Sequence, residues 1–206
     1  MGSALGSLPP QVQAFHEGVG VRRWAGVCDV RRGGGAPARM LATLFGFPRA
    51  GLRVPICVTV TPHRHGEMWT RNFGGQVLRS FQWAGDRGSS PLLFERFGPV
   101  RVGSRLIPDG ERLRILPQKG SIFGLPIPRA LLPSGEAFEA EREGCFSFDV
   151  SINLPLIGLL VAYTGALTPW DDGHESGREA VDFPSEARAM RSQDAGRVLT
   201  NRLPAP

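Results

Sequence analysis

Strict alternation of apolar and polar residues over short runs is the feature that most constrains the fold of this chain. In the clearest run, residues 52–61, every second residue is leucine, valine or isoleucine. Successive side chains of a strand point to opposite faces, so each such run predicts a strand with one buried face. The runs are separated by turns that draw on 27 glycines and 18 prolines, which favours a turn-rich β protein over a helical bundle.

The alternating runs predict about nine or ten strands. We expect them at residues 21–31, 52–61, 67–73, 76–83, 92–97, 100–107, 112–116, 136–143, 145–154 and 159–167. Pro55, inside the second run, predicts an edge strand or a bulge. Two short helices are expected at 8–16 and 37–45, where proline stands near the start and glycine just beyond the end. The Pro- and Gly-rich segment 120–133 is typical of an irregular crossing loop.

The order of these elements predicts the fold class. The strands follow one another through short turns instead of alternating with helices, which is typical of an antiparallel meander. We expect a mainly β domain of the α+β type, formed by a single strongly curved antiparallel sheet or partial barrel with two short N-terminal helices. A lipocalin-like barrel and a helix-grip cup both agree with this pattern.

A change in composition predicts where the domain ends. Residues 1–167 contain 19 basic and 12 acidic side chains, whereas residues 168–206 contain 5 basic and 7 acidic ones. The second part also has almost no apolar periodicity. We therefore expect a β-rich domain over 1–167 and a mostly disordered C-terminal tail over 168–206.

Residues 150–170 are uncharged and long enough to span a bilayer. Their alternation and their interruption by proline and glycine predict two buried strands instead, and we expect no membrane span. Residues 1–10 lack the pattern of a signal peptide. Three cysteines in strand-like runs are too few for a disulfide framework, which predicts free thiols and a cytoplasmic location. These are Cys28, Cys57 and Cys145.

Three features of the sequence resemble binding motifs but lack the residues that such sites require. Residues 33–38 match the dinucleotide-binding pattern G-x-G-x-x-A, but no acidic residue follows before Gly66, so we expect a flexible loop and no cofactor. His63 and His65 lie in a turn without an acidic or cysteine cluster, so no metal site is expected. The net charge of +5 comes from arginines spread over all strands, without a nucleic-acid-binding motif, so no nucleic-acid partner is expected.

A few charged residues share a strand face with aromatic ones. In 67–73, Arg71 lies on the face of two aromatic side chains, and in 93–97 Glu95 lies on the face of another. If these faces point inward, Arg71 and Glu95 are partners beneath aromatic walls and form a cup for a polar ligand group. If they point outward, both are solvated. The candidate ligand-binding residues are Trp69, Arg71, Phe73, Glu95, Phe97 and Tyr163, the last being the only tyrosine.

Six segments carry a family resemblance: Leu8 to Pro10, Phe45 to Pro48, Glu67 to Gly75, Glu95 to Pro99, Gly124 to Arg129, and Phe148 to Gly165. Together they resemble a bacterial domain of unknown function that is found alone or fused C-terminal to saccharopine-dehydrogenase-like oxidoreductases. The resemblance covers roughly residues 8–167. It implies a β-rich module and a connection with reductase, sugar or lipid metabolism, and it transfers no catalytic residues.

Three functions remain open from the sequence. The first is a cytoplasmic module that binds a small, largely apolar ligand in the concave face of the sheet without chemistry of its own. The second is an enzyme that uses Arg71, Glu95 and Tyr163. The third is an interaction domain that serves a separate oxidoreductase in trans. A cavity favours the first two, and a filled interior favours the third.

Overall fold

The computed structural model of the protein describes residues 6–85 and 92–170. It contains the helices α2 (Pro10–His16) and α3 (Ala36–Leu44) and a short 3-10 helix, η1 (Arg129–Leu131). The strands are β1 (Arg22–Arg32), β2 (Gly51–His63), β3 (Gly66–Phe73), β4 (Gln76–Ala84), β5 (Leu93–Phe97), β6 (Val100–Pro108), β7 (Arg112–Ile122), β8 (Leu125–Pro126), β9 (Ala137–Arg142), β10 (Cys145–Leu154) and β11 (Gly158–Pro169).

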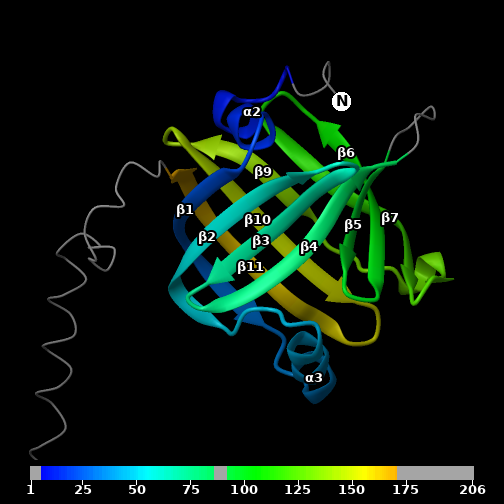
Figure 1. Cartoon of the computed structure of the whole chain (residues 1–206). Coiled ribbons are helices and arrows are strands. Elements are labelled where there is room, and N and C mark those ends of the chain that lie inside the picture. The colour runs from blue at the N-terminus through cyan, green and yellow to red at the C-terminus, as the bar shows by residue number, and fades with distance from the viewer. Residues whose placement is uncertain (1–5, 86–91, 171–206) are drawn as a thin grey trace, which may run out of the picture. The chain divides into compact units, whose positions relative to one another are not determined.

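Ten of these strands form a closed antiparallel barrel (Figure 1). Each strand from β1 to β7 pairs with the next, β9 follows β7, and β11 returns to pair with β1. The two-residue strand β8 pairs only with β7. The mainly β, antiparallel prediction is therefore confirmed. Of the two arrangements that the sequence left open, the closed meander agrees with the barrel, because a helix-grip cup leaves its sheet open.

The two helices lie at opposite ends of the barrel (Figure 1). α2 buries Val12 and Phe15, and the ring of Phe15 stacks on Phe146 of β10 with 3.8 Å between the ring centroids. α3 packs near β1 and β11 through two buried alanines, Ala38 and Ala42. Both helices begin with proline in the first turn, which was the signal that predicted them.

Alternation correctly predicts the inward face of the second half of β2 but fails at its start. Ile56, Val58 and Val60 are buried, but Leu52, predicted on the same face, is 81% exposed. The ladder between β1 and β2 shifts register near this position, and Arg53 has a positive φ of 48°. This irregularity is the bulge that Pro55 predicted. It places the side chain of Leu52 on the outer face of the strand.

β7 is longer than predicted. It continues through residue 122, beyond the expected end at 116, and β8 and η1 lie within the segment that was predicted to be irregular. Pro117, which follows the predicted end of the strand, lacks an N–H to donate to the ladder. The structure accommodates it where the β6–β7 register shifts between Gly103 and Ser104, so the ladder resumes after the proline.

The end of the chain was predicted to be a separate tail. β11 ends at Pro169, and the amide N–H of Trp170 donates to the carbonyl of Arg23 over 2.8 Å. The rest of the predicted tail, 171–206, lies outside the described residues. No helix within the described ranges is long and apolar enough to cross a bilayer.

Candidate functional site

The interior of the barrel contains a cavity of about 450 Å³. This volume lies in the range of small-molecule binding sites. Side chains from α2 and from most of the strands line it, and the majority of these are apolar. The apolar walls include Ile56, Val58, Leu106, Leu113, Phe146, Phe148, Val150 and Ile152. The barrel is therefore not filled by its own core.

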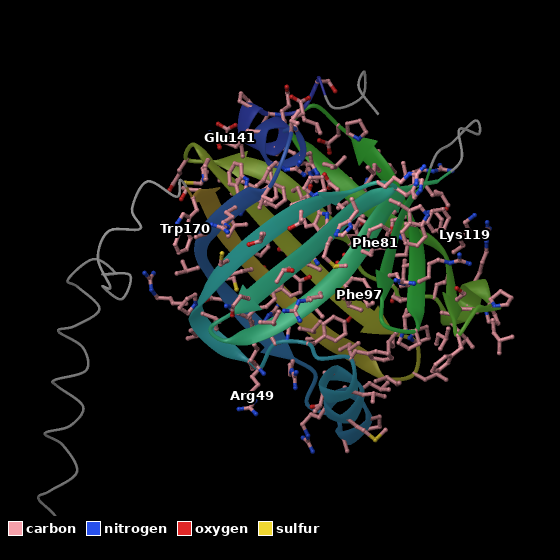
Figure 2. All side chains as sticks on the ribbon, viewed as in Figure 1. Arg49, Phe81, Phe97, Lys119, Glu141 and Trp170 are labelled. Atoms are coloured by element: carbon pink, nitrogen blue, oxygen red, sulfur yellow. The ribbon has the colours of Figure 1, made fainter. Side chains whose placement is uncertain are left out.

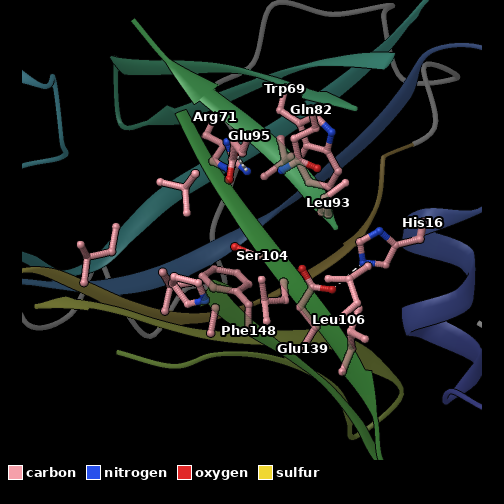
Figure 3. A pocket seen from close by; sticks show the side chains of 18 of the residues that line it. His16, Trp69, Arg71, Gln82, Leu93, Glu95, Ser104, Leu106, Glu139 and Phe148 are labelled. Carbon is pink, nitrogen blue, oxygen red and sulfur yellow. Dashed lines mark hydrogen bonds and ion pairs between the residues drawn. The ribbon is translucent and has the colours of Figure 1, made fainter. Parts of the chain in front are cut away.

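Arg71 forms a charged cluster inside the barrel with two neighbours from adjacent strands (Figure 3). Its Nη1 donates to Ser80 Oγ at 2.8 Å, and its Nη2 donates to Glu95 Oε1 at 3.1 Å. The Ser80 hydroxyl donates to the same carboxylate oxygen at 2.6 Å. The side chains of Arg71 and Glu95 are 13% and 23% exposed. Of the two orientations that the sequence left open, the structure therefore has the inward one for both residues.

Trp69 lies beside this cluster on β3. The guanidinium of Arg71 stands over its ring, 5.0 Å from the centroid, in a cation–π arrangement. The indole N–H donates to Glu67 Oε2 at 3.3 Å, and the other oxygen of Glu67 accepts a hydrogen bond from Arg22 at 2.7 Å. One face of β3 therefore carries alternating charged and aromatic groups, each with a partner.

A second ionisable pair joins α2 to the wall of the barrel. His16 Nε2 lies 2.5 Å from Glu139 Oε2. Figure 3 shows the two side chains facing each other. Burial, the largest effect, lowers the pKa of His16, but the charge of Glu139 and its hydrogen bond together raise the pKa above its usual value. A further contact anchors the same helix: the amide N–H of Gln11 donates to Glu141 Oε2 at 2.9 Å, and Figure 2 shows Glu141 beside α2.

Among the lining side chains that are not exposed, three neutral polar ones have no hydrogen bond to any described residue. Gln82 and Ser104 are each 9% exposed, and Tyr163 presents its ring between Phe73 and Phe148. Burial raises the pKa of Tyr163 to about 12, although Arg71 acts in the opposite direction. The phenol is therefore protonated near neutral pH and serves as a donor or an acceptor, not as a base.

The structure brings most of the predicted site residues together. Trp69, Arg71, Glu95, Phe97 and Tyr163 line the cavity. Phe73 is buried but is not part of the lining, and it packs against the ring of Tyr163 at 5.5 Å. Whether these residues bind a ligand stays a prediction.

The sequence analysis missed several polar residues of the site. Ser80 and Gln82 lie on the buried face of the run 76–83, but its other face carries more apolar residues, so alternation gave no signal for either of them. The pairing of His16 with Glu139 spans 123 positions and left no local signal. The missed residues include His16, Ser80, Gln82, Ser104 and Glu139.

The structure locates two of the motifs that predicted no site. No group of three or more potential ligands gathers to hold a metal ion within the described ranges, and both histidines of the β2–β3 turn, His63 and His65, are exposed. The glycine loop at 33–35 connects β1 to α3, and a side chain at Gly33 would meet the carbonyl oxygen of Leu159 at 1.8 Å. Close backbone approach accounts for at least this glycine without a nucleotide.

Comparison with known proteins gives a family and nothing more specific. The model of a domain of unknown function, DUF4166, matches residues 8–167, which include every strand of the barrel up to the last two residues of β11. No curated protein and no solved structure matches the chain. The resemblance seen in the sequence is thereby confirmed as to family, while bacterial origin and fusion to dehydrogenases stay predictions. With the match spanning the barrel and its cavity, the chain belongs to the family of the domain of unknown function DUF4166.

Proposed function

We propose that this domain binds a small, largely apolar molecule inside its barrel and performs no chemistry on it. The observation that supports this is the 450 Å³ cavity, whose lining is mostly apolar and contains a few converging polar groups. A barrel whose purpose is only structural is filled by side chains, since an empty apolar space forfeits packing energy.

The enzyme alternative has less support from the geometry. Arg71 and Glu95 are engaged with each other, and Tyr163 is protonated near neutral pH. An interaction domain that serves an oxidoreductase in trans does not require a cavity. We also propose a cytoplasmic location, because Cys28, Cys57 and Cys145 are free thiols in the structure.

Native mass spectrometry of the purified protein tests the proposal directly, through retention of a small molecule that is released on denaturation. A polarity-sensitive dye supplies a second measurement. Val150→Trp, which fills the cavity, is expected to abolish dye binding, whereas Val77→Trp on the exterior leaves it intact. Equal dye binding by both variants, with no retained molecule, rules out the barrel interior as the site.

A further inference from the structure

The positive charges at the cavity already have acidic partners. The ionisable side chains in its lining include Arg71, Glu67, Glu95, Glu139 and His16. Arg71 is bound by Glu95, and His16 by Glu139. Glu67 is bound by Arg22. No cation of this group is left over for an anionic ligand.

A carboxylate ligand would therefore meet an unfavourable environment. Placed beside Arg71, its charge lies close to that of Glu95, and two carboxylates sharing one cation in a poorly solvated site repel each other. An ionised group that is buried without its own counter-charge is strongly disfavoured.

The groups left without partners are neutral. Gln82 offers an amide, Ser104 a hydroxyl and Tyr163 a phenol, and together they supply both donors and acceptors. Two of them are more than nine-tenths buried, so that a bound molecule is the natural partner for their hydrogen bonds. The surrounding walls are apolar.

We infer that the ligand of this cavity has an apolar body and a neutral, hydrogen-bonding head such as an alcohol, and that carboxylates are excluded by the internal pairing of Arg71 with Glu95. This inference rests on the proposed function. It specifies the chemical class of the ligand, and it assigns the exclusion of carboxylates to Glu95.

The test compares three probes with the same chain: decanol, decanoate and decylammonium. Each is used near neutral pH to displace a polarity-sensitive dye from the full-length protein. We expect decanol to displace the dye at a concentration at least tenfold lower than the other two. Decanoate or decylammonium binding as tightly as decanol overturns the inference while leaving the proposed function intact. Absence of dye and probe binding altogether rejects the proposed function itself.

A charge-neutralising variant tests the mechanism of exclusion. Glu95→Gln leaves the charge of Arg71 uncompensated, so the affinity for decanoate is expected to rise at least tenfold relative to decanol. Glu136→Gln is the matched control, since Glu136 pairs with Arg114 outside the cavity and carries the same change of charge. An unchanged ratio in folded Glu95→Gln overturns the inference. If this variant fails to fold, as judged by its melting curve, the ranking of the three probes on the unaltered protein remains decisive.

Discussion

Charged residues inside this barrel occur in small neutral groups. Arg71 shares Glu95 with Ser80, and Arg22 shares Glu67 with the indole of Trp69. Burying a charge is unfavourable unless it is paired and hydrogen-bonded, so each cation depends on its partner. The sequence suggested the first of these groups because Arg71 and Glu95 each share a strand face with aromatic residues. Ser80 lacked any such mark, since a serine in a strand is usually exposed.

The Arg71–Glu95 pair is expected to show strong thermodynamic coupling. In a double-mutant cycle of Arg71→Met and Glu95→Gln, measured by denaturant unfolding, we expect a coupling energy above ~1 kcal/mol, because either single change leaves a poorly solvated charge alone. The surface pair Arg114–Glu136 has a shorter distance, 2.8 Å, but greater exposure, and the same cycle there is expected to give under about 0.5 kcal/mol. Equal coupling in the two cycles contradicts the burial argument.

His16 is expected to make stability depend on pH. Its pKa is raised in the folded protein, so its contribution is fully present below the unfolded value near 6.5 and is lost as the pH rises through the folded value. The difference in unfolding free energy between the unaltered protein and His16→Gln should therefore shrink from pH 5.5 to pH 8.5, roughly the window around the histidine pKa. His63→Gln, at an exposed turn, provides the control. A difference that grows with pH means that burial dominates and that His16 is neutral in the fold.

At the scale of elements, alternation identified the strands, and backbone irregularities account for the errors at the start of β2 and the end of β7. In β4 the buried face is the more polar one, because Ser80 and Gln82 point into the barrel. The predicted strand ends agree with the structure to within two residues in nine of the ten barrel strands, β7 being the exception. Leu52 and Pro117 lie at two of the register shifts in the barrel, and both mark errors of the prediction. Such shifts depend on the partner strand, which a single run of sequence does not reveal.

Glycines at the seam between β1 and β11 are expected to be essential for closure. A Cβ at Gly26 would lie 2.0 Å from the carbonyl oxygen of Ala166, which is backbone of the facing strand. We expect Gly26→Ala to destabilise the protein by at least about 2 kcal/mol in denaturant unfolding, through backbone displacement along the ladder. Gly34→Ala is the control, because nothing lies within 4 Å of that position. Near-neutral behaviour of both variants contradicts the close approach.

At the scale of the whole molecule, closure was the part that the sequence left open. A curved sheet or partial barrel was predicted, but alternation gives the face of a strand and not its neighbour. The decisive pairing joins Trp24 to Pro169, at opposite ends of the fold. The cavity follows from that closure, since inward faces from strands around the barrel enclose one space. His16 and Glu139 meet there for the same reason.

Two truncated proteins are expected to differ sharply in thermal stability. A protein ending at residue 170 keeps every barrel strand and should melt within about 2 °C of the full chain. A protein ending at residue 157 lacks β11, which carries the buried side chains of Leu160, Val161 and Leu167, and should show no cooperative transition. Circular dichroism during heating distinguishes them. A cooperative transition in the shorter protein contradicts the central role of closure, and a lower melting temperature in the longer one shows that 171–206 contribute to stability.

The pairing of the first strand with the last has a consequence for synthesis on the ribosome. β1 is complete long before β11, and at typical translation rates the delay is on the order of ten seconds. Throughout that interval the nascent chain exposes the backbone donors and acceptors of β1 on one side, an edge that attracts other strands. The finished barrel has no free strand edge. During synthesis, however, the unfinished chain passes through a stage in which it is most prone to aggregation.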